Sequence, residues 1–108
     1  MEQIIAANVI VLSTPVYYYS VCAQLKMMID RTLPLGAGSG KTGGKEFYFI
    51  TTAAAPSAME CTMADLQGFV DCVPGSVLKG KVYGQAFGVG EIKGKAVMAE
   101  AYNYGKKC

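Results

Sequence analysis

The chain has 108 residues, of which 52% are hydrophobic and 17% charged, and its net charge is +2. This length is enough for one domain with one core, and the high apolar fraction argues against a disordered chain. So small a charge is not that of a nucleic-acid-binding protein. We therefore expect one folded domain, residues 1–108, that does not bind nucleic acid.

The cysteines are scattered and the chain has no histidine. No Cys-x-x-Cys pair occurs, so the clustered ligands of a zinc or iron–sulfur site are absent and no metal site is expected. A Ser-His-Asp triad is excluded as well. No apolar run approaches the ~20 residues that cross a bilayer, and no basic leader precedes the first apolar run. These features predict a cytoplasmic protein with no membrane partner, in which any redox chemistry belongs to a cofactor.

The first predicted elements are a helix end, a strand and a helix. Residues 2–7 resemble the end of a helix, and residues 9–13 form a continuous apolar run rich in β-branched residues. Such a run is typical of a parallel strand covered on both faces. Ser20 is expected to cap the next helix, which Pro34 and Gly36 end. Its apolar face is expected to hold Val21, Leu25, Met28, Ile29 and Leu33.

The rest of the chain continues the alternation of strand and helix. Residues 35–45 are expected to be a mobile Gly-rich loop, and residues 46–55 a second apolar strand. Ser57 and Glu60 match the capping box at the start of a helix. Residues 81–89 predict a third strand and residues 95–104 a last helix. This order predicts an α/β fold, with a parallel sheet and helices on both of its faces.

Two glycine motifs resemble nucleotide-binding loops but differ in spacing. Residues 38–42 read GSGKT, yet the phosphate loop needs another glycine at the position of Leu35 and must follow a strand rather than a helix. Residues 88–94 read GxGxxxG instead of the dinucleotide fingerprint GxGxxG. We interpret the first as a flexible connector and the second as a turn, which excludes a nucleotide triphosphatase.

Two predicted strand ends carry residues that suit a flat aromatic ligand. Residues 14–20, TPVYYYS, offer hydroxyl groups, a proline turn and aromatic faces, whereas residues 51–56, TTAAAP, let a planar ring come close to the backbone. Adjacent parallel strands end at one side of a sheet, where open α/β sheets bind ligands. The residues alone leave open the alternative that the tyrosines cover the sheet end or pack against a partner subunit.

Residues 8–31 contain, in order, the first strand, TPVYYYS, AQLK and IDR. In this arrangement they resemble the flavodoxin-like superfamily, specifically the NADPH-dependent FMN reductases and the multimeric flavodoxins, a group that includes iron–sulfur flavoproteins. Residues 51–55, 59–69 and 100–106 are similar to the same group. The resemblance implies FMN as cofactor, NAD(P)H as a partner, electron or hydride transfer by the flavin, and a homodimer or other homo-oligomer.

The resemblance also implies which residues contact the flavin. No side chain is expected to be the catalyst, because the protein orients the flavin and tunes its N5 and N1 atoms. The residues expected to border the isoalloxazine follow the first strand, and those expected to approach it from the next strand follow the second. They are Thr14, Pro15, Val16, Tyr17, Tyr18, Tyr19 and Ser20, and then Thr52, Ala53 and Ala54.

The family's phosphate loop has no counterpart in these residues. In the family, a first strand and a Ser/Gly/Asn-rich loop hold the FMN phosphate at a helix start, and the strand order is 2-1-3-4-5. We expect a partial domain with about three strands, the third, fourth and fifth of that order. Charge-assisted hydrogen bonds contribute ~1.5–3 kcal/mol each, so FMN binding is expected to be weak or absent.

The same departure predicts an exposed strand edge. Without the family's first strand beside it, the strand at residues 9–13 is expected to be an apolar edge that pairs, swaps or aggregates. An alternative to the enzyme is therefore a non-enzymatic remnant or assembly module, which forms a homo-oligomer through this edge strand.

Overall fold

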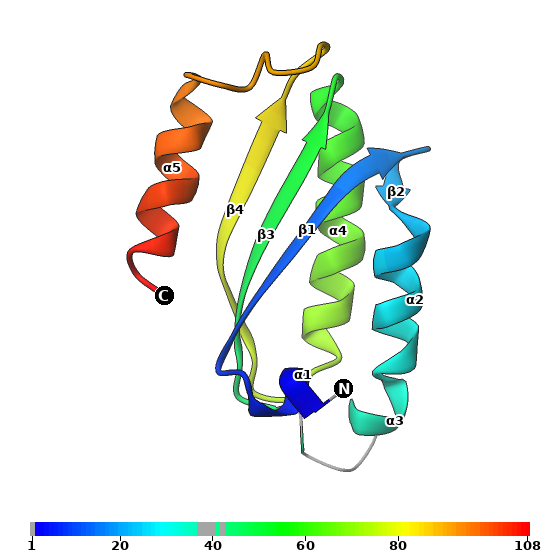
Figure 1. Ribbon diagram of the computed structural model, residues 1–108. Helices are drawn as coiled ribbons and strands as arrows, with labels where there is room; N and C mark the ends of the chain where they lie inside the picture. Colours follow the sequence, from blue (N-terminus) through cyan, green and yellow to red (C-terminus); the bar gives the residue numbers. More distant parts are fainter. Residues whose placement is uncertain (1, 37–40, 42) are drawn as a thin grey trace.

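A computed structural model of the chain describes residues 2–36, 41 and 43–108. Residues 37–40 and 42 of the expected Gly-rich loop lie outside the described residues. They include all of the GSGKT segment except Lys41. Within the described residues, no helix has the length and apolar character needed to cross a membrane. The elements are α1 (Glu2–Ala6), β1 (Val9–Tyr17), β2 (Ser20–Val21), α2 (Ala23–Arg31), α3 (Leu33–Gly36), β3 (Glu46–Ala53), α4 (Pro56–Asp71), β4 (Val77–Gln85) and α5 (Ala96–Gly105), shown in Figure 1.

The sheet has the strand order β2-β1-β3-β4. β1, β3 and β4 are parallel, so their carboxyl ends lie at one end of the sheet (Figure 1). Tyr48 of β3 packs against Tyr104 of α5, and the next residue, Phe49, is in the core cluster with Leu66 of α4. Because successive strand residues point to opposite faces, α4 and α5 cover opposite faces. The predicted α/β fold, with a small parallel sheet between helices, is confirmed.

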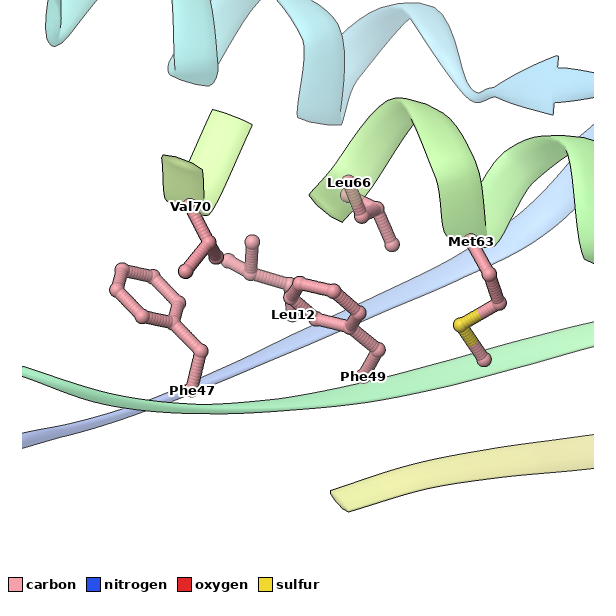
Figure 2. Close-up of a cluster of buried hydrophobic side chains, with 6 residues drawn as sticks. All are labelled: Leu12, Phe47, Phe49, Met63, Leu66 and Val70. Atoms are coloured by element: carbon pink, nitrogen blue, oxygen red, sulfur yellow. The ribbon is translucent and has the colours of Figure 1, made fainter. Parts of the chain in front are cut away.

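The core lies between β1, β3 and α4. Phe49 and Leu66 are fully buried, and the ring of Phe47 meets that of Phe69 edge-to-face at 5.9 Å between centroids. Burying one such side chain stabilises the fold by roughly 1.5–3 kcal/mol. Figure 2 shows the cluster, which consists of Leu12, Phe47, Phe49, Met63, Leu66 and Val70.

The strands differ in extent from the sequence prediction. β1 continues to Tyr17 rather than ending at Ser13, and a short strand, β2, pairs with its end in antiparallel orientation. Pro15 lacks the N–H that a ladder needs, but β1 is an edge strand at this position, where proline is tolerated. β4 begins and ends four residues earlier than residues 81–89, because Val77 pairs with Glu46 at the start of β3.

Two predicted helix caps are wrong. Ser20 lies in β2 and its hydroxyl donates to Asp65 Oδ2 of α4 at 2.8 Å, so Cys22 takes the N-cap position of α2. Ser57 lies inside α4, which starts at Pro56. Proline fits the first helical position because it needs no N–H there and its φ is already helical, and this preference sets the helix start one residue before the predicted cap.

The predicted exposed edge of the first strand is present in the described pairings. β1 pairs with β3 along one side from residue 9 to residue 15. Its described pairing with β2 is limited to Val16 and Tyr17. Val11 is 53% exposed on this strand. The apolar strand therefore offers free backbone groups along most of its length.

The docking of α5 depends on Gly80 of β4. A Cβ atom at this position would lie 2.6 Å from Cε1 of Tyr104, whose ring packs against Tyr48 with 5.6 Å between centroids. Gly80→Ala is therefore expected to displace α5 and to lower the free energy of unfolding by about 1–3 kcal/mol. Urea unfolding followed by circular dichroism measures this change.

Gly68→Ala is the matched control, because a Cβ atom at Gly68 in α4 has nothing within 4 Å. This change is expected to stabilise the helix by roughly 0.5–1 kcal/mol. If both variants gained stability, the close contact between β4 and α5 would not be a constraint.

Candidate functional site

The structure brings the two predicted ligand segments together. Thr14 pairs with Thr51 and Pro15 with Thr52 where β1 and β3 run side by side, and Gly84 of β4 pairs with Thr52. All of these residues lie in the carboxyl-terminal halves of their strands, whose carboxyl ends meet at one end of the sheet (Figure 1). The candidate site is therefore built on three adjacent strand ends, as is usual for ligand sites in open parallel sheets.

Residues 17–20 form a tight hairpin between β1 and β2. Tyr17 pairs with Ser20, and the two residues between them have positive φ angles, 49° at Tyr18 and 65° at Tyr19. A two-residue hairpin loop with two positive φ angles is a type I′ turn, which normally contains Asn-Gly. Tyrosine in this region is strained by about 1–3 kcal/mol per residue. All three tyrosine side chains are exposed, and that of Tyr18 completely.

The hydroxyl groups of this segment are used within the protein. Thr14 is buried, and its Oγ1 donates to the carbonyl oxygen of Pro15 at 2.7 Å and accepts from the Cys22 amide at 3.0 Å. Hydrogen bonding with the Thr14 side chain also holds the pKa of the Cys22 thiol below its ordinary value. With Ser20 bonded to Asp65, these hydroxyls hold the hairpin against α2 and α4. The surface they leave for a ligand is mainly aromatic.

The second segment offers small side chains and fixed backbone. Ala53 and Ala54 are half-buried, and Thr52 is exposed beside Gly84, where a Cβ atom would lie 2.9 Å from Cγ2 of Thr52. The Gln85 side-chain amide donates to the carbonyl oxygen of Ala54 at 3.1 Å. A planar group can therefore approach this backbone closely. Because the backbone is already held by this hydrogen bond, it does not have to become ordered when a ligand binds.

A third loop, residues 86–91, lies at this end of the sheet, and we call it the Glu91 loop. Sequence reasoning predicted a turn at residues 88–94 but did not connect it with the ligand site. Its Glu91 carboxylate accepts hydrogen bonds from the amides of Phe87 at 2.7 Å and Gly88 at 3.0 Å, and from Lys95 Nζ at 2.7 Å. The bond from Lys95, followed by those from the two amides, lowers the pKa of Glu91 to about 2. The i,i+4 spacing of Glu91 and Lys95 was the signal in the sequence.

A large apolar cavity lies away from these loops. It measures about 640 Å³ and lies between α2, α4 and the sheet, where Ile10, Phe47 and Phe69 contribute to an apolar lining. Ser20, one of the predicted flavin-contact residues, lines a smaller cavity of about 220 Å³ beside α4. The tyrosine side chains of the candidate site are exposed.

Comparison with known proteins agrees with this architecture. The chain superposes on the flavodoxin, WrbA-like protein from Agrobacterium tumefaciens with a TM-score of 0.72 and 20% identity, covering 98% of this chain and 71% of that one. For the Trp repressor binding protein from Bacillus subtilis, the TM-score is 0.73 and the identity 21%, with 91% of this chain and 69% of that one covered. The fold is thus flavodoxin-like.

Sequence comparison identifies the family. Residues 1–88 match the family model of NADPH-dependent FMN reductase, and the chain belongs to this family. It is also 29% identical over 115 residues to the FMN-dependent NADH:quinone oxidoreductase 2 of Pseudomonas aeruginosa. This alignment covers 99% of the chain but only 51% of that relative, so the chain spans about half of the relative's length.

Proposed function

We propose that this chain supplies the isoalloxazine-binding part of an FMN-dependent oxidoreductase, which uses NAD(P)H to reduce a quinone-type acceptor. The observation that carries the proposal is the pairing of Pro15 with Thr52, in a chain of the FMN reductase family. This pairing brings the segment that leads into the hairpin at residues 17–20 to the same end of the sheet as residues 52–54. The named activity of the relative, which the chain matches over half its length, supports the choice of acceptor.

The residues present fit a flavin ring. Exposed tyrosine rings at residues 17–19 provide faces for stacking, and the small side chains of Ala53 and Ala54 leave room next to backbone that is already hydrogen-bonded. FMN, when bound, supplies the redox chemistry. The chain's own part is to orient the ring, to shield one of its faces and to present backbone polar groups to its edge.

We also propose that the 108-residue polypeptide binds FMN mainly through the ring and therefore weakly. By resemblance, the family holds the phosphate with a loop that precedes its third strand, and none of these 108 residues matches that loop. A cytoplasmic location is part of the proposal, because all four cysteines are free thiols and a reducing compartment keeps them so.

Fluorescence titration of the purified polypeptide with FMN and with riboflavin, which has no phosphate, tests this proposal. Binding through the ring predicts dissociation constants that agree within about threefold, and a loss of at least about fivefold in affinity for Tyr18→Ala/Tyr19→Ala, since stacking contributes about 0.5–1.5 kcal/mol per pair. Tyr102→Ala is the control, because Tyr102 is an exposed tyrosine of α5. Absence of binding at millimolar flavin, or equal effects of these variants, would overturn the proposal.

A second candidate function is assembly of a homo-oligomer through the β1 edge. The observation that favours it is the one-sided pairing of residues 9–15, together with the exposure of Val11. Two copies that pair along β1 would satisfy the free backbone groups of both. Light scattering is expected to show a dimer that Val11→Lys dissociates, whereas Met27→Lys, at a similarly exposed position of α2, leaves it intact. A monomeric unmodified chain would exclude this function.

A further inference from the structure

The Glu91 loop is attached to the proposed flavin site by direct hydrogen bonds. The amide of Ala86 donates to the carbonyl oxygen of Ala53 at 3.1 Å, and the neighbouring Gln85 side chain donates to that of Ala54. Lys95 Nζ donates to the carbonyl oxygen of Gln85 at 2.8 Å. The loop therefore begins next to the backbone that is proposed to face the isoalloxazine.

The conformation of this loop is fixed by the charged pair of Glu91 and Lys95. One carboxylate oxygen binds two successive amides, at Phe87 and Gly88, and the other binds Lys95. Gly90, with φ at 79°, allows the reversal that returns Glu91 to these amides. Since the loop is ordered by its own polar contacts, its apolar side chains are free to contact something else.

Those side chains project into solvent. Phe87 is 80% exposed and Val89 is fully exposed, although both are large apolar residues next to a proposed ligand site. Neither is in the hydrophobic core cluster or packed against it. Large exposed apolar groups on an ordered loop mark a contact surface, and the bond from the Ala86 amide to Ala53 places the start of this loop next to the proposed flavin site.

We propose that the Glu91 loop is a preformed binding surface for the second reactant of the flavin site, an uncharged planar ring of the quinone class. Phe87 and Val89 contact the ring, and Glu91 is a positioning residue that holds them. This inference rests on the proposed function. A dinucleotide would require a cation for its phosphates; Glu91 and Lys95 compensate each other, so Lys93 is the exposed cation of the adjoining segment that a dinucleotide would use.

Amide chemical shifts of the 108-residue polypeptide, titrated with duroquinone, test the inference. This quinone is fully substituted, so it does not add to the four free thiols. The largest shift changes are expected at residues 86–91, with and without riboflavin. Phe87→Ala and Glu91→Gln are each expected to raise the quinone dissociation constant at least fivefold. Leu33→Ala, at an exposed residue of α3, is the control and leaves it unchanged.

The riboflavin affinity of the same variants separates positioning from a general structural effect. A positioning role predicts that Glu91→Gln weakens quinone binding while the riboflavin dissociation constant stays within twofold, and that Glu91→Asp restores part of the quinone affinity. Equal losses for both ligands would overturn the positioning role.

Other outcomes are equally decisive. Quinone shifts confined to the lining of the large cavity, such as Ile10 and Phe69, would overturn the inference, as would NADH shifts at residues 86–91 that Lys93→Ala abolishes. Riboflavin binding without quinone shifts in the Glu91 loop would reject this surface alone. Quinone shifts there without flavin binding would reject the proposed function and keep the surface.

Discussion

Replacing Phe49 with alanine is expected to lower the free energy of unfolding by about 3–5 kcal/mol, the usual cost of removing a buried phenylalanine. Phe49 is 0% exposed, and it lies in the middle of the core cluster, near Leu12 of β1 and Leu66 of α4 (Figure 2). Domains of this size are stable by about 5–15 kcal/mol. The variant is therefore expected to lose a large part of the stability of the fold.

Urea unfolding of the wild type and the variant, followed by far-ultraviolet circular dichroism, measures this loss. Phe87→Ala removes the same atoms from an exposed position, and surface changes of this kind usually stay within about 0.5 kcal/mol. Equal midpoints for Phe49→Ala and Phe87→Ala would contradict the placement of the core between β1, β3 and α4.

Replacing Tyr18 and Tyr19 with asparagine and glycine is expected to stabilise the fold and to weaken flavin binding. Both positions have positive φ angles, and Asn-Gly is the preferred sequence of such a turn. Relief of the strain, about 1–3 kcal/mol at each of the two residues, predicts a gain of at least about 1 kcal/mol in the free energy of unfolding. The loss of two exposed aromatic faces predicts a flavin affinity at least about fivefold lower, the size expected for two stacking contacts.

The comparison with Tyr18→Ala/Tyr19→Ala separates these two effects. Alanine also removes the rings, but it keeps a Cβ atom at positive φ, so flavin affinity should fall without the gain in stability. Urea midpoints and flavin titrations of both double variants provide the measurement. If the Asn-Gly variant were less stable than the wild type, the tyrosines would be stabilising the turn rather than straining it.

The fold was predictable where residue type and spacing act locally. The apolar run of β3 and the alternation of strands with helices indicated the parallel sheet. The end of β1 was not predictable, because Pro15 is a poor ladder residue and the pair Tyr18-Tyr19 has none of the usual turn residues. The hairpin with β2 depends on tertiary support, to which the bond between Ser20 and Asp65 contributes.

The candidate site was also predictable only where residue type and spacing act locally. Residues 14–20 and 51–56 were expected at one end of the sheet, and the register of β1 and β3 places them there. Thr14 was expected to face a ligand, but its hydroxyl is bonded to Cys22 and Pro15. The Glu91 loop was predicted only as a turn, because its amides find their acceptor only once the chain has turned back at Gly90.

The register of β1 also has a consequence for synthesis on the ribosome. Val9 pairs with Glu46, and at roughly 5–20 residues per second these two residues are made several seconds apart. The hairpin of β1 and β2 needs only nearby residues and closes within about 1–10 μs. During translation, the rest of this apolar strand therefore stays unpaired for seconds, and a nascent-chain chaperone would find its binding segment at residues 9–15.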